Sequence, residues 1–550
     1  MDPARKAFID KFLATLSSRE TSYLQRQLRK GLPCLTDLPS ELVCLVSEHL
    51  DIEDVLSCRL VSRSWNRAWD AESVASSLCR HFFLGLLQTQ PSESQTPARE
   101  LFLQAARRFL RRHWAPPTQW VFLPWSKGET STFVRFKDIT QLDKFRHRHS
   151  DNFDNIEPPS RLVYGDGKLA WEISYSSCVY VDDLRACTRK ICSSSPPGVY
   201  TDSKLRAVTK DLLILCADPH IMSKELDQIF VWHLGLQEWE ILTLPGRFSK
   251  CFAENERAAF VTDENRVIAW SWGGEAIEIS ANSDFDPPSD TPLAQPGVIW
   301  HPFCQDVLFV VRVLTQATVS EIEVLKYKGG KLVSRLTKLM SGLIPSWDWD
   351  WESARIVPFC QKINNHGLHW VRAIDESEFQ GKTDDADKWL VGFGFNVLTE
   401  TFVQRRYMSA QGFRGRWRQA GHDRRSGMAW DHQVITAPGP GQAIEWLQVE
   451  RDLAGCPKHT DLARLRLGLT KLIHKSFWAF GDQDFLVLAG RRGVSVWTFC
   501  QVPGLLEAEE PETEIITEMI GGRSWRAFGY RHDDETWLLT DEESEHYHSS

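Results

Sequence analysis

The sequence predicts an α+β chain of two unlike parts, a small helical N-terminal part followed by a large all-β domain. Before Pro117, apolar residues recur at the three- and four-residue spacing of amphipathic helices. After Pro117, short runs of β-branched and aromatic residues alternate with turn residues such as Gly and Asp. A degenerate repeat ending in Trp recurs in this second part. Together these observations predict helices first and sheets afterwards.

Residues 1–30 are predicted to form one helix, with apolar residues on one side and Lys and Arg on the other. The segment lacks the continuous apolar core of a secretory signal, and no stretch of the chain approaches the ~20 apolar residues of a membrane span. We therefore expect the cytoplasm or nucleus as the compartment and no membrane partner.

Residues 34–80 are predicted to form several short helices. Pro39 suits the first turn of a helix, because its φ is already fixed near the helical value. Asp51 can cap a second helix, and Asp54 favours the positive end of that helix dipole. Its most informative part, residues 34–69, has only about 35 residues, and a unit below ~40 residues rarely buries this much apolar surface alone. The segment is therefore expected to complete its core against another part of a protein.

The segment contains, in this order, Leu38-Pro39, Asp54-Val55-Leu56, Arg59-Leu60-Val61-Ser62 and Trp65. This order resembles an F-box, the module by which substrate receptors dock onto the adaptor of SCF-type (Skp–cullin–F-box) ubiquitin ligases. The resemblance implies a Skp-family adaptor and, through it, a cullin as partners. The alternative is an ordinary helical hairpin packed on its own domain. The residues that the resemblance assigns to the adaptor surface or its support are Leu35, Leu38, Pro39, Leu42, Val46, Leu50, Leu56, Leu60, Val61 and Trp65.

Residues 81–117 are predicted to form a helical linker, ended by Pro116 and Pro117. Its helix from Glu100 to Trp114 carries four arginines opposite an apolar face. A solvated face is the favoured interpretation of these arginines, and nucleic-acid binding is the alternative. The net charge of −9 argues against nucleic acid as a partner.

Residues 118–545 are predicted to form a β-propeller of seven or eight blades. The repeat recurs at 169–171, 229–232, 267–270 and 494–497, and such units bury their faces only against neighbouring copies. The region from 161 to 540 holds about 380 residues, enough for this number at ~40–50 residues per blade. A pair of β-sandwiches is the alternative. The passages YGDGKLAWEI and VWHL…LPGRFSKC resemble the degenerate propeller-type region of fungal F-box proteins.

Two segments of this domain are candidates for substrate binding. In Trp347–Glu352, strand alternation would place the tryptophans, Trp349 among them, on one face and the acids on the other. The alternative is a strand with a buried aromatic face and a wet acidic face. In the basic stretch 405–425, Arg414, Arg416, Trp417 and Arg418 suit an acidic or phosphorylated peptide. A solvated loop is the alternative there.

No catalytic motif, zinc-site spacing or phosphate-binding loop occurs, so neither a metal nor a cofactor is predicted. The 13 cysteines include no CxxC pair, and no disulfide is expected. The resemblance implies a non-catalytic substrate-recognition subunit of an SCF-type E3 ubiquitin ligase that captures an unknown protein substrate with the propeller. The alternatives are an F-box scaffold outside any ligase and a propeller enzyme resembling a glycosidase.

Overall fold

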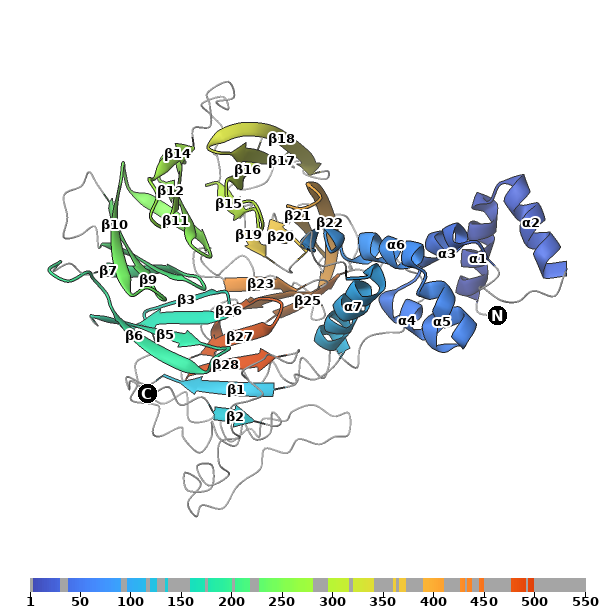
Figure 1. Ribbon diagram of the computed structural model, residues 1–550, viewed down its shortest axis with the longest axis horizontal. Coiled ribbons are helices and arrows are strands. Elements are labelled where there is room, and N and C mark those ends of the chain that lie inside the picture. Colours follow the sequence, from blue (N-terminus) through green and yellow to red (C-terminus); the bar gives the residue numbers. More distant parts are fainter. Residues whose placement is uncertain are drawn as a thin grey trace, which may run out of the picture.

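The computed structural model confirms the predicted class, a helical N-terminal region followed by a large all-β region of several four-stranded sheets (Figure 1). The structure describes residues 3–29, 38–90, 96–114, 119–125, 134–136, 159–173, 177–199, 203–217, 227–279, 295–315, 320–340, 360–362, 366–371, 389–409, 426–430, 433–437, 445–449, 476–490 and 493–498. Within these residues, no helix combines the length and apolar character that crossing a membrane requires.

The helical region begins with two helices where the sequence predicted one. Ser17 interrupts the segment because it begins a new helix with a capping box. Its backbone N–H donates to Glu20 Oε2 (2.7 Å), and the Glu20 N–H donates to Ser17 Oγ (3.4 Å). The helices of the region are α1 (Pro3–Thr15), α2 (Ser18–Arg29), α3 (Ser40–Ser47), α4 (Ile52–Leu60), α5 (Arg63–Trp69), α6 (Glu72–Phe82), the 3-10 helix η2 (Leu87–Thr89) and α7 (Ala98–Trp114).

Helices α3 to α7 share one hydrophobic core. Val43, Val55 and Trp69 contribute to it from the short helices, and Phe102 and Phe109 from α7. Glu72 Oε1 accepts a hydrogen bond from the backbone N–H of Ala98 (3.0 Å), which fixes the start of α7 against α6. Helix α7 thus packs into the core of the short helices instead of serving as a bare linker. We call α3 to α7 the helical module.

The β region consists of antiparallel sheets in which strands that are consecutive in the chain pair in order. Four sheets have four strands: β3 (Arg161–Gly165), β4 (Lys168–Glu172), β5 (Cys178–Asp183) and β6 (Thr188–Ser193); β7 (Ser203–Val208), β8 (Leu212–Ala217), β9 (Asp227–His233) and β10 (Glu238–Leu244); β11 (Phe248–Glu254), β12 (Arg257–Thr262), β13 (Val267–Ser271) and β14 (Ile277–Ile279); β15 (Gly297–Trp300), β16 (Val307–Thr315), β17 (Ser320–Lys328) and β18 (Lys331–Met340).

The remaining strands form two larger sheets among the described residues. One joins β19 (Cys360–Lys362), β20 (Leu368–Val371), β21 (Trp389–Asn396) and β22 (Thr401–Ser409) to β23 (Ser426–Trp430), β24 (Gln433–Ala437) and β25 (Glu445–Val449) through pairing of β22 with β25. The other holds β26 (Ser476–Gly481), β27 (Phe485–Gly490) and β28 (Gly493–Thr498) together with β1 (Gln119–Pro124) and β2 (Val134–Phe136).

The sheets are arranged around a common centre, as in a β-propeller, and α6 and α7 lie beside them (Figure 1). By chain order the described strands form seven units, because β19–β22 and β23–β25 are separate runs. Strand β1 closes the circle by pairing with β28, from Gln119 opposite Thr498 to Pro124 opposite Gly493. The first strand of the domain therefore completes the last sheet.

The Trp repeat does not mark one structural position. Trp232, Trp270 and Trp497 lie on the third strand of their runs (β9, β13 and β28), whereas Trp171 lies on the second strand, β4. A clearer repeat occurs where the third strand turns into the fourth. This repeat has five residues. The side chain of the first, which is polar, accepts hydrogen bonds from the backbone N–H groups of the third and fourth. The second residue is a buried aliphatic one, and the fifth has a positive φ. The three examples are Asp183–Cys187, His233–Gln237 and Asn396–Glu400.

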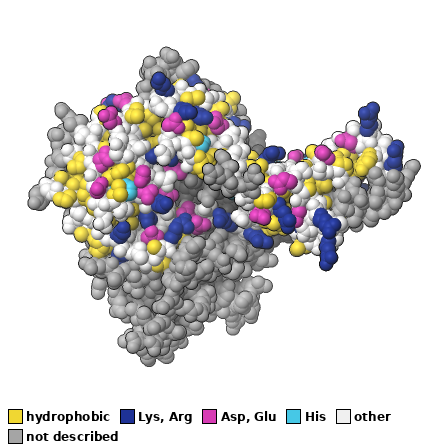
Figure 2. All heavy atoms as spheres, viewed as in Figure 1, with side chains coloured by type: hydrophobic (Ala, Val, Ile, Leu, Met, Phe, Trp, Pro, Cys, Tyr) yellow, Lys and Arg dark blue, Asp and Glu magenta, His cyan; other side chains and the backbone are white. Residues whose placement is uncertain are grey.

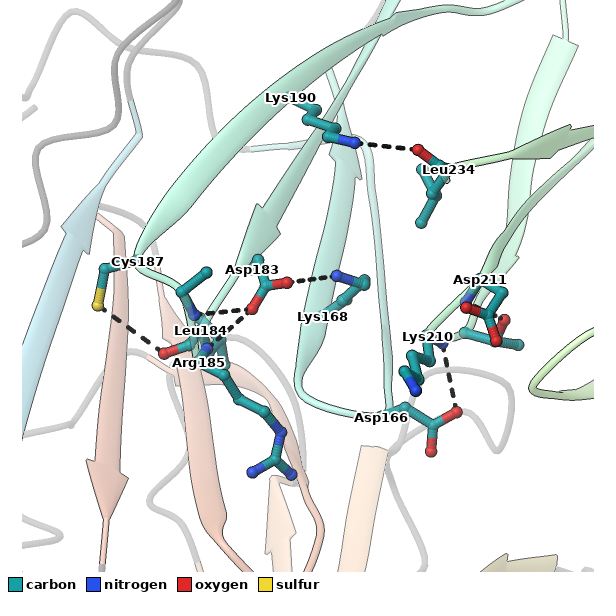
Figure 3. A network of polar contacts seen from close by, with 12 residues as sticks. Asp166, Lys168, Asp183, Leu184, Arg185, Cys187, Lys190, Lys210, Asp211 and Leu234 are labelled. Carbon is teal, nitrogen blue, oxygen red and sulfur yellow. Dashed lines mark hydrogen bonds and ion pairs between the residues drawn. The ribbon is translucent and has the colours of Figure 1, made fainter. Parts of the chain in front are cut away.

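These turns lie at the same end of each sheet as the turns joining the first and second strands, because the strands alternate in direction. We call this end of the domain, with connections such as 165–168, 183–188, 208–212, 233–238, 362–368 and 396–401, the turn face. Polar contacts join neighbouring sheets on it. Lys190 Nζ donates to the carbonyl of Leu234 (2.9 Å), and the Lys210 N–H donates to Asp166 Oδ2 (3.4 Å) (Figure 3). Arg185 likewise reaches Asp484 on the closing sheet (2.8 Å).

Candidate docking surface on the helical module

Large apolar side chains are exposed at two places on the helical module, and Figure 2 shows hydrophobic side chains at its surface. Leu60, the last residue of α4, is 85% exposed, and Val61 beside it is 62% exposed. Leu45 on α3 is 49% exposed. Exposing aliphatic side chains of this size to water is unfavourable, and adjacent exposed ones such as Leu60 and Val61 are typical of a surface that binds another protein. We call Leu45, Leu60 and Val61 the apolar docking residues.

The structure separates the predicted adaptor residues into exposed and supporting groups. Pro39, Leu60 and Val61 are exposed, while Leu42 and Val46 are half-buried on α3. Four others pack against the core from partly buried positions, namely Leu38, Leu50, Leu56 and Trp65. Leu35 lies outside the described residues. Sequence reasoning placed Leu45 on the apolar stripe of this helix with Leu42, three residues before it, but did not count Leu45 among the adaptor residues.

The exposed position of Leu60 and Val61 follows from what holds the residues on either side. The preceding Arg59 is buried and forms an ion pair with Asp70, which Arg99 on α7 also contacts (3.0 Å). Burial lowers the pKa of the Arg59 guanidinium, and the negative charge of Asp70 opposes this effect. Ser62 then caps α5 by accepting the N–H of Trp65 (3.2 Å). Fixed on both sides, Leu60 and Val61 stay in the solvent.

A defined joint connects the helical module to the propeller. Asn396 Nδ2, at the turn between β21 and β22, donates to the carbonyls of Leu84 (2.8 Å) and His366 (3.0 Å). The ring of Phe83 packs on that of His366, with centroids 5.5 Å apart. Gly85 approaches so closely that a β-carbon there would overlap the His366 carbonyl oxygen. The module is therefore attached to the turn face of the run β19–β22.

Sequence reasoning missed this joint, because its only local signal was a glycine, Gly85, and the role of Asn396 is visible only in the structure. Gly85 interrupts an apolar, helix-compatible segment, and its φ of +84° is one that glycine adopts most readily. Asn396 occupies the repeated turn position but also bonds outward to the helical module, unlike Asp183 and His233 in the same position.

The candidate substrate residues of the propeller, Trp349, Arg414, Arg416, Trp417 and Arg418, lie outside the described residues. The described strands β22 and β23 flank the arginine segment, ending at Ser409 and beginning at Ser426. Within the part of the chain that the structure describes, no three His, Cys, Asp or Glu side chains are grouped so that they could hold a metal ion. The apolar docking residues of the helical module are therefore the candidate site that the described geometry favours.

Comparison with known proteins agrees with this description of the N-terminal part. The model of the F-box domain matches residues 35–80, which include α3, α4, α5 and most of α6. The chain therefore contains an F-box domain over these residues. No curated protein matches the chain.

Three solved structures illustrate the folds that resemble this chain, each covering more than half of it. YCF48 from Cyanidioschyzon merolae is 10% identical with a TM-score of 0.32, covering 62% of this chain and 97% of its own. AztD from Citrobacter koseri is 12% identical with a TM-score of 0.31, covering 54% and 71%. The β-propeller domain of the Trilobed protease from Pyrococcus furiosus is 10% identical with a TM-score of 0.30, covering 64% and 99%. Likenesses of this size carry no functional argument, and the propeller description rests on the chain's own sheets.

Proposed function

We propose that this protein is the substrate-recognition subunit of an SCF-type E3 ubiquitin ligase, of the kind that fungal F-box proteins represent. The observation that carries the proposal is the F-box at residues 35–80 with Leu60 and Val61 exposed at the end of α4. In this role the apolar docking residues bind a Skp-family adaptor, which in turn binds a cullin. Burying an aliphatic side chain contributes ~1.5–3 kcal/mol, so a few such residues support a stable interface.

The propeller's role in this proposal is to hold a protein substrate. The protein performs no covalent step itself, since the conjugating enzyme on the cullin transfers ubiquitin to the substrate. Its contribution is to raise the effective concentration of substrate lysines near that enzyme. A fixed joint suits this role, because the contacts of Phe83, Leu84 and Asn396 limit how far the substrate can move relative to the adaptor. The compartment we propose is the cytoplasm or nucleus.

The test is capture of a purified Skp-family adaptor by the full chain, compared with a Leu60→Asp, Val61→Asp variant. Both side chains are exposed, so the substitutions should leave the fold intact and weaken capture at least about tenfold. Leu236→Asp, at an exposed leucine on the propeller turn face, is the matched control and should capture the adaptor normally. Adaptor capture that survives the double substitution would remove these residues from the interface.

Two further outcomes separate this role from its alternatives. Capture of the adaptor without a cullin would favour an F-box scaffold that acts outside a ligase. Charge reversal of Arg414, Arg416 and Arg418 is expected to abolish substrate capture and leave adaptor capture unchanged. If substrate capture survives that change, the arginine segment is not the substrate site.

A further inference from the structure

Strand β18, at the outer edge of one propeller sheet, has the features of a strand that can pair with a strand from another protein. Strand β18 has 10 residues and is the longest outer strand in the described part of the domain, compared with 6 in β6, 7 in β10 and 3 in β14. The 9-residue β22 is paired on its outer side with β25. Among the described residues, β18 pairs with β17 alone. Within this described part of the domain, its other side offers a row of main-chain donors and acceptors.

This edge is apolar to a degree that unpaired edges normally avoid. Leu332 is 46% exposed, Val333 57% and Leu339 63%. Ile277 on the neighbouring outer strand β14 is exposed as well and lies against the turn before β18, where a β-carbon on Gly330 would be 3.4 Å from its Cγ2. Natural sheets guard their edges with short strands, charges or covering loops, since long apolar edges recruit other chains. The exposure of these side chains indicates a binding edge.

The charges on β18 indicate which kind of strand would bind. The strand carries Lys331, Arg335 and Lys338 and has no acidic residue, although the whole chain has a net charge of −9. Arg335 is paired with Glu323 on β17, while Lys331 and Lys338 extend into solvent. The outer strands β10 and β14 instead carry glutamates. A second copy of β18 would bring like charges together, so self-pairing is disfavoured.

We propose that β18 binds an extended segment of another protein in which apolar residues alternate with Asp or Glu, and that this segment adds to the sheet as a further strand. Main-chain hydrogen bonds along the edge supply affinity, and the apolar and basic side chains supply specificity. The inference rests on the proposed function only in taking the bound segment to be part of a substrate. Binding of the segment itself needs neither the F-box nor the adaptor.

The experiment measures fluorescence anisotropy of labelled peptides of about 10 residues, the length of β18, on the full chain. One peptide alternates valine with glutamate, a second replaces each glutamate with lysine, and a third has a proline at its centre, which removes a main-chain donor. We expect binding of the first peptide only, weakened by salt. No binding of the glutamate peptide, or equal binding of the lysine peptide, would overturn the proposal.

Two variants connect the binding to this edge. The double variant Lys338→Glu, Leu339→Ser should lower the affinity for the glutamate peptide at least about tenfold, because it removes one basic and one apolar contact. Thr243→Glu with Ile241→Ser likewise adds a negative charge and removes an exposed apolar side chain, here on the outer strand β10, and should leave the affinity for the glutamate peptide within about twofold. Equal losses in both variants would contradict a site at β18.

Hydrogen exchange gives a readout that a surface-charge effect would not produce. Peptide addition as a strand should protect the outward backbone amides of β18 and leave those of β10 unchanged. Adaptor capture by the Lys338→Glu, Leu339→Ser variant should remain normal. If the peptide binds while the wild-type chain fails to capture the adaptor, the edge site stands and the ligase role fails.

Discussion

Replacing Gly85 by alanine should loosen the joint between the helical module and the propeller. Gly85 has a φ of +84°, and a β-carbon there would overlap the His366 carbonyl oxygen and lie 3.1 Å from Leu398 Cδ1. Because the backbone of the 366 turn cannot yield as a flexible side chain would, the segment 83–85 must move away. That movement breaks the hydrogen bond from Asn396 to the Leu84 carbonyl.

The cost of losing the joint can be separated from the cost of placing alanine at a positive φ. Gly198 has nearly the same φ, +82°, but no heavy atom lies within 4 Å of a β-carbon placed there. Alanine in the left-handed region costs ~1–2 kcal/mol at either position. At Gly85 the lost hydrogen bond adds ~0.5–1.5 kcal/mol. The lost ring contact between Phe83 and His366 adds a similar ~0.5–1.5 kcal/mol. We therefore expect Gly85→Ala to lower the free energy of unfolding by ~1–3 kcal/mol more than Gly198→Ala does.

Native-state hydrogen exchange measures this directly. The backbone N–H groups of Leu398 and Thr399 both donate to Asn396 Oδ1, so their opening free energy reports on the turn that holds the module. Exchange at these amides should accelerate in Gly85→Ala and stay unchanged in Gly198→Ala. Equal exchange in the two variants, with equal loss of thermal stability, would refute the reasoning.

The remaining predictions concern closure, pH and thiol reactivity. Gly493→Ala should destabilise the propeller and expose β1 to proteolysis, because its β-carbon would overlap the backbone of the closing strand; unchanged proteolysis would contradict this. Burial tends to raise the pKa of Asp183, but hydrogen bonds, first from Lys168, lower it below its usual 3.8. Stability from this carboxylate is therefore present above about pH 4 and lost as pH falls further. In Asp183→Asn, the urea midpoint of unfolding should therefore fall less steeply as pH is lowered in the acid range. An unchanged pH dependence would count against this role of Asp183. Burial raises the pKa of the Cys79 thiol to about 12, so in native protein iodoacetamide should label exposed Cys304 well before it, as mass spectrometry would show.

The helical module was largely predictable because its order is local. Pro39 directly precedes α3, one residue before the first turn predicted for it. Asp51 is the N-cap residue of α4 as predicted, although its side chain makes no capping bond. The apolar spacing on 100–114 predicted much of the face that α7 buries, including Leu101, Ala106 and Phe109. The break at Ser17 was missed because apolar periodicity continues across it, while the Ser17–Glu20 capping box that causes it was legible in the sequence.

The joint and the exposed edge depend on residues far apart in the chain, so periodicity could not reveal them. Asn396 contacts Leu84 across 312 positions, and the sequence around either residue does not indicate that it contacts the other. The Trp repeat predicted the architecture but not its register, because tryptophan fills space on more than one strand of a sheet. The repeated turn was a better marker, since its side-chain acceptor and its positive φ each satisfy a local backbone requirement.

The pairing of β1 with β28 has a consequence for synthesis of the chain on the ribosome. The two strands are separated by about 370 residues. At ~5–20 residues per second, translation of that interval takes about 20–70 s. During this time the nascent chain carries a helical unit whose core is complete and a strand whose partner does not yet exist. Contacts of such long range form late and slow folding. Truncated or stalled chains would keep that strand unpaired, which makes them candidates for chaperone binding and degradation before release.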